Sequence, residues 1–203
     1  MSKLFKPIDY LKIQHPQKLK YDLYIPAFVA ILGTLLLIIL PQPVKFFGEN
    51  GLVIVITNIL QMLTGFYIAS LAAVATFQKE DLDKPMPGRP LEITVAIQGV
   101  KKEEALTRRR FLCLLFGYLA LLSFFLYFIG AGANLLVPNA KYIIPIKLHH
   151  IARWIFAIIY LFLTANLMIT TLHGLYYMVE RIHRSDPVLI KKDRGDNVGD
   201  AGH

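Results

Sequence analysis

Four long stretches without a charged residue divide the chain. They run from Tyr24 to Leu40, from Leu52 to Phe77, from Phe111 to Val137 and from Trp154 to Met178. Each reaches the roughly 17 apolar residues that an α-helix needs to cross the hydrocarbon core of a bilayer. The pattern therefore predicts four transmembrane helices.

The connections predict how these helices are joined. Residues 41–51 allow only a short turn between the first two, and 138–153 form a modest external loop between the last two. We therefore expect an all-α integral membrane protein made of two antiparallel hairpins, 24–77 and 111–180. The other segments are a basic amphipathic arm at 1–23, a basic cytoplasmic segment at 78–110, and a partly disordered cytoplasmic tail at 181–203.

The central segment holds a different pattern. The apolar residues Leu91, Ile93, Val95 and Ile97 alternate with Glu92, Thr94 and Ala96. This pattern is typical of a short β-strand. A lone strand is unstable in water, so it must pair with a neighbouring stretch, a sister subunit or the edge of a soluble partner. From Lys101 the pattern predicts a helix that continues into the third span.

Charge gives the chain an expected orientation. The protein has 22 lysines and arginines against 14 acidic residues, and 55% of it is hydrophobic. Eighteen of the 22 basic residues lie in the arm, the central segment and the tail. By the positive-inside rule both termini and the central segment face the cytoplasm, as in a multi-pass protein of the bacterial inner membrane. The excess charge is thus a topology signal, and direct binding to nucleic acid is not expected.

One face of the second span carries small and amide side chains. Asn58, Gln61, Gly65 and Ala69 fall within a narrow sector at 100° per residue. Small residues let helices approach closely, and amides bond across to another helix. Helix packing, within or between subunits, is one interpretation, and a polar pore lining is the other.

The fourth span has a polar stripe of its own, formed by Asn166, Thr170 and His173. Burial of a histidine side chain in hydrocarbon is energetically unfavourable, so its presence at this depth indicates a structural or functional role. Either it is a neutral imidazole bonded by Thr170 or by a side chain of the second span, or it is a protonatable element of a gate or proton path.

Catalytic patterns are absent from the sequence. The four charge-free stretches contain no acidic residue, and no phosphate-binding glycine loop, HExxH, GxSxG or CxxC occurs. The adjacent His149 and His150 diverge on a helix and do not form a metal site by themselves. We therefore expect no enzyme activity, no metal and no cofactor.

The run LTGFYIASLAAVATF at 63–77 leads into LDKPMPG at 82–88. Together with two hairpins, both ends inside and a basic centre, it resembles the membrane subunit of the Kiwa anti-phage defence system. The resemblance covers the architecture of most of the chain and assigns no residue. It implies a homo-oligomeric membrane sensor that holds a cytoplasmic DNA-binding effector at the inner face, and releases or activates it when phage attack disturbs the envelope.

Three hypotheses follow. The first is a non-enzymatic scaffold and sensor that docks a cytoplasmic protein, for which the candidate docking residues are Arg108, Arg109, Arg110, Leu91, Ile93, Val95 and Ile97. The second is an oligomeric pore lined by the polar residues of the second and fourth spans. The third is a lipid-facing chaperone or assembly factor.

Overall fold

The computed structural model describes residues 3–14, 19–42, 44–78, 80–84, 92–97, 100–143 and 145–181. It is largely helical and confirms four helices that are long and apolar enough to cross a membrane. These candidate spans are Lys20–Ile39, Leu52–Thr76, Arg108–Asn139 and Lys147–Val179. The chain is therefore compatible with a multi-pass membrane protein.

The helices and strands follow one another along the chain with short links. The long helices are α1 (Ile25–Ile39), α2 (Leu52–Thr76), α4 (Arg108–Ile143) and α5 (Ile146–Tyr176). Shorter elements are η1 (Lys3–Lys12), β1 (Ile13–Gln14), η2 (Lys20–Tyr24), α3 (Glu80–Asp83), β2 (Glu92–Ile97), β3 (Val100–Ala105) and η3 (Tyr177–Arg181).

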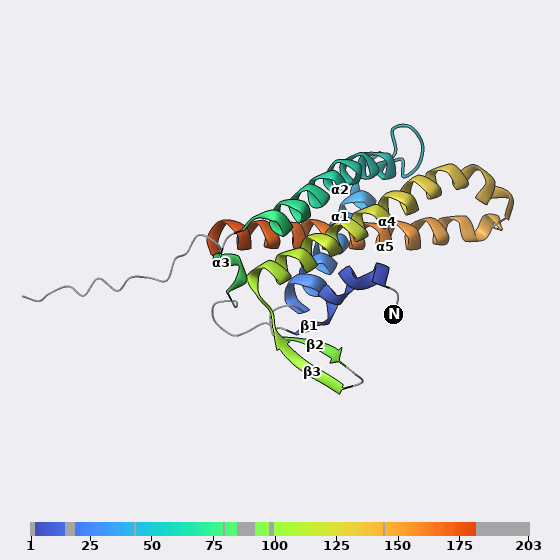
Figure 1. Ribbon diagram of the computed structural model, residues 1–203. Helices are drawn as coiled ribbons and strands as arrows, with labels where there is room; N and C mark the ends of the chain where they lie inside the picture. The colour runs from blue at the N-terminus through green and yellow to red at the C-terminus, as the bar shows by residue number, and fades with distance from the viewer. Residues whose placement is uncertain are drawn as a thin grey trace, which may run out of the picture.

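The bundle is built on contacts between the two halves of the chain. The helix α2 packs along α4, α1 packs along α5, and α4 contacts α5, whereas α1 and α2 hardly touch (Figure 1). The buried side of α2 carries Val53, Leu60 and Tyr67, and it meets a row of fully buried leucines on α4. Most of α1 is exposed, with only Pro26 and Ala30 buried. Packing of apolar and small faces is what joins such helices in lipid.

The two ends of the bundle differ. The connection between α1 and α2 and the turn between α4 and α5 lie together at one end, here called the loop end (Figure 1). There Phe46 packs edge-on against Trp154, with ring centroids 5.4 Å apart, and Arg153 lies 5.6 Å from the centroid of Phe46. Gly48 makes the turn with φ of 102° and donates its N–H to Asn134 Oδ1 at 2.8 Å.

The opposite end, here called the sheet end, carries α3, the C-terminus of α5 and a small antiparallel sheet of order β1-β2-β3 (Figure 1). The strands β2 and β3 form a hairpin in which Glu92 lies opposite Ala105 and Ile97 opposite Val100. The strand β1 adds only two pairs, Ile13 with Ile93 and Gln14 with Glu92.

Three expectations about these boundaries were wrong. The stretch 138–153, expected as a loop, is largely helical, because α4 continues to Ile143 and α5 begins at Ile146. The residues after Lys101 form β3 rather than a helix, and the helix begins only at Arg108, where Thr107 Oγ1 accepts the N–H of Arg110 at 3.3 Å. The four consecutive charged residues at 101–104 are compatible with a hairpin strand as well as a helical turn, and pairing with β2 decides between them. The first span also starts earlier, at Lys20, so that Asp22 belongs to it.

Candidate functional site

The N-terminal arm packs against the bundle beside α4. Tyr10 is 4% exposed, and its ring stacks on that of Tyr118 at a centroid distance of 5.0 Å. It also meets Phe111, at 6.4 Å between centroids. One turn before Tyr10, Pro7 lies against Gly117, where a Cβ would come within 3.4 Å of the proline Cβ. The absence of a side chain at Gly117 therefore lets the arm approach α4 closely.

A chain of hydrogen bonds continues from Tyr118 across α5 to η2, which precedes α1. The hydroxyl of Tyr118 donates to Asn166 Oδ1 at 3.2 Å, and Asn166 Nδ2 donates to the backbone carbonyl of Asp22 at 2.6 Å. An amide in hydrocarbon is stable only when both of its ends are bonded. Asn166 therefore fixes the first helix to the fourth span and to α4. We call Tyr10, Tyr21, Asp22, Tyr118, Asn166 and His173 the arm junction.

His173 takes part through its ring. It stacks on Tyr21 with centroids 4.8 Å apart and an angle of 24° between the planes. The expectation that Thr170 bonds this histidine was wrong, because Thr170 Oγ1 is buried and has no hydrogen-bond partner. His173 therefore meets Tyr21 of the first span, which precedes the charge-free stretch that begins at Tyr24.

The Tyr10 phenol is held neutral. Burial raises its pKa well above the usual 10.0, and the charge of Asp22 raises it further. Because the phenol of Tyr10 is neutral, the arm packs against Tyr118 of α4 without burying the charge of a phenolate.

The arm junction is connected directly to the sheet. Tyr10 lies three residues before Ile13, which is also buried and pairs with Ile93 of β2. Any shift of the arm along α4 is therefore transmitted to β1 and the β2–β3 hairpin.

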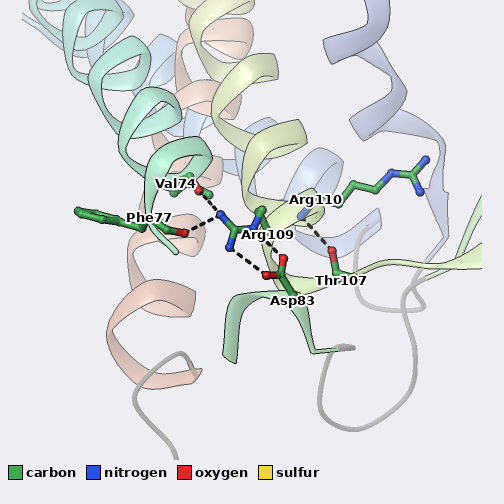
Figure 2. A network of polar contacts seen from close by, with 6 residues as sticks. All are labelled: Val74, Phe77, Asp83, Thr107, Arg109 and Arg110. Carbon is green, nitrogen blue, oxygen red and sulfur yellow. Dashed lines mark hydrogen bonds and ion pairs between the residues drawn. The ribbon is translucent and has the colours of Figure 1, made fainter. Parts of the chain in front are cut away.

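A second polar cluster holds the sheet end together (Figure 2). Arg109 donates to both carboxylate oxygens of Asp83, at 2.7 and 3.0 Å, and to the carbonyls of Val74 and Phe77 at 3.1 and 2.6 Å. The last carbonyls of a helix have no partner within it, so Arg109 caps α2 while pairing with α3. The guanidinium lowers the pKa of Asp83 below its usual 3.8, so the pair persists at neutral pH and is lost only as acid protonates Asp83 through the lowered pKa.

The predicted docking residues occupy different surroundings. Arg109 is engaged inside the protein, Arg108 is buried, and Arg110 is half-buried and points away from Asp83 (Figure 2). Ile93, Val95 and Ile97 lie in β2, the middle strand of the sheet, and Leu91 lies outside the described residues. The side chain of Arg110 therefore lies outside the Arg109–Asp83 pair (Figure 2).

The two polar stripes lie on different surfaces. Asn58, Gln61, Gly65 and Ala69 are all exposed, on the side of α2 opposite its buried residues. Asn166 and Thr170 are buried between helices, where Asn166 meets α4 and η2. The protomer therefore does not bring the two stripes together around one path.

Sequence reasoning missed Tyr10, Asp22, Tyr118 and Asp83. Asp22 lay two residues before the first charge-free stretch, and extending the helix backwards from Tyr24 would have included it. Nothing in the sequence pairs Tyr10 with Tyr118, because their contact depends on how the arm folds back.

Comparison with protein-family models, with curated proteins and with solved structures gives no match.

Proposed function

We propose that this chain is a non-enzymatic scaffold and sensor subunit of the bacterial inner membrane. It has four transmembrane helices with both termini in the cytoplasm, assembles with copies of itself, and docks a cytoplasmic effector at its sheet end. The resemblance to the Kiwa membrane subunit supports a role in anti-phage defence and an effector that binds DNA. The arm junction supplies the sensor, because it joins three spans to the sheet.

The observation that carries the proposal is the exposed stripe of α2. Gly65 has nothing within 4 Å of where a Cβ would lie, and the amides of Asn58 and Gln61 make no hydrogen bond to another described residue. In hydrocarbon an unbonded amide is unfavourable, and small residues permit close helix contact. A second copy of α2 would supply hydrogen-bond partners for these amides. It would also allow close contact between the two faces that carry small residues.

Gly65→Phe tests the assembly. A phenylalanine fits the protomer at this open position but blocks a close contact of α2 with another copy, so we expect the oligomer to dissociate to a smaller species. Light scattering of the protein in nanodiscs measures the mass. The matched control is Gly33→Phe on α1, which also has open space around its Cβ position and should leave the mass unchanged. An unchanged mass for Gly65→Phe would exclude the α2 interface.

Arg110→Glu tests the docking. Reversal of this charge is expected to reduce recovery of the effector at least tenfold when the protein is purified from cells that express it in its native genomic context, a loss of about 1.4 kcal/mol in binding. The mass of the membrane assembly should not change. Lys45→Glu, exposed at the loop end, is the control. Equal recovery with both variants would argue against docking at the sheet end.

A further inference from the structure

The three consecutive arginines at the start of α4 divide into different roles. Arg109 makes four hydrogen bonds within the protein, and Arg110 is half-buried. Arg108 is only 9% exposed, although arginine is one of the residues that proteins almost never bury without a partner. The hydrogen bonds of Arg109 do not involve Arg108, so they do not explain why Arg108 is buried.

The guanidinium of Arg108 makes no hydrogen bond to another described residue. Its Nε is shielded from solvent and has no hydrogen-bond partner. The carboxylate of Asp83 is already used on both oxygens by Arg109. A buried polar group without a hydrogen bond is unfavourable, and an anion that reaches the guanidinium would offset this cost.

The backbone holds Arg108 in a fixed place. Its N–H donates to the carbonyl of Lys84 at 3.2 Å, and Thr107 caps the first turn of α4. One turn further, Leu112 is completely buried and extends the same side of α4 as apolar surface. Arg108 thus lies where the apolar span ends, next to the cations Arg109 and Arg110 in sequence.

We propose that Arg108 binds a phosphate group, supplied by an anionic lipid headgroup. The phosphates of a bilayer lie at the level where a transmembrane helix leaves hydrocarbon, and Arg108 is the first residue of the span Arg108–Asn139. Because Nε is shielded, the two Nη groups of the guanidinium are the donors that would bond to oxygens of the phosphate. The positive charge of the guanidinium favours an anion over a neutral ligand. This site is separate from effector docking and does not depend on the orientation of the protein.

Arg108→Met tests the proposal because its effect on stability relative to the wild type should change sign when the lipid is added. Methionine has a similar length and no charge, so in a maltoside detergent without phosphate the variant should be at least as stable as the wild type, because an unpaired buried charge has been removed. When dioctanoyl phosphatidylglycerol is added at about ten times its Kd, the Tm of the wild type should rise by about 4 °C while that of Arg108→Met does not move. Lys45→Met, which removes an exposed charge at the loop end, is the control and should keep the rise.

Two further additions identify the chemistry. Dioctanoylglycerol has the same chains without phosphate and should not raise the Tm of the wild type. Inorganic phosphate that is as effective as the lipid would show a soluble phosphate compound to be the ligand and would overturn the lipid source. Equal shifts for wild type and Arg108→Met, or equal shifts with phosphatidylglycerol and dioctanoylglycerol, would overturn the site itself. The comparison of the two lipids on the wild type decides the phosphate dependence even where Arg108→Met is not recovered.

Discussion

Tyr10→Ala is expected to lower the free energy of unfolding by about 3 kcal/mol and to release the arm from α4. Tyr10 is 4% exposed and its ring meets both Tyr118 and Phe111, so alanine leaves a cavity where three aromatic rings meet. Loss of this anchor also frees β1, because only two residue pairs hold β1 to β2. If the arm transmits a signal, effector binding should become insensitive to the stimulus in this variant.

A disulfide reports whether the arm is in place. A Cβ at Gly117 would lie 3.4 Å from the Cβ of Pro7, close to the separation found in disulfides. The pair Pro7→Cys and Gly117→Cys, in a Cys113→Ser background, should oxidise readily, and addition of Tyr10→Ala should slow this reaction. Tyr10→Phe keeps the ring and should behave like the parent. Leu11→Ala, at an exposed neighbour, should do the same. Fast oxidation in all variants would show that Tyr10 does not anchor the arm.

Gly130→Leu is expected to destabilise the bundle by about 3 kcal/mol, because it overpacks the point where three helices meet. A Cβ at Gly130 would collide with the hydroxyl of Tyr160 from α5 and would lie 2.6 Å from Thr57 Cγ2 of α2. Tyr160 also donates to the carbonyl of Leu126 at 3.4 Å, so its ring has little freedom to move away. The measurement is the Tm in detergent.

The control is two residues further along the same helix. Gly132 has nothing within 4 Å of its Cβ position, so Gly132→Leu changes the same residue type on α4 without a collision. Its Tm should stay near that of the wild type. Similar losses for both variants would mean that leucine at these positions disturbs α4 itself rather than its packing on α2 and α5.

The sequence predicted the spans well because their signal is local. A charge-free run of the right length is sufficient to mark a helix, and α2 was predicted to within one residue at its end. The beginning of the first span was missed because Lys20 and Asp22 interrupt the apolar run, although the polar backbone of Asp22 is bonded by Asn166, 144 residues later. A contact at that separation leaves no trace in hydrophobic periodicity.

The candidate sites divided in the same way. The exposed stripe of α2 follows from helical spacing alone, since the period of the helix determines which residues share a face. The separate roles of Arg108, Arg109 and Arg110 could not be predicted, because consecutive helical residues diverge by about 100° and meet different neighbours. Asp83 was missed as the partner of Arg109 because α3 folds back only through tertiary contact.

The attachment of α1 to α5 has a consequence for biogenesis. The first helix enters the bilayer long before its partner has been synthesised, and 144 residues separate Asp22 from Asn166. At ordinary rates of translation this interval is roughly 7 to 30 seconds. During that time the first span, which would lie in lipid, has neither α5 nor the amide of Asn166 beside it, so the first and last spans can join only when synthesis is nearly complete.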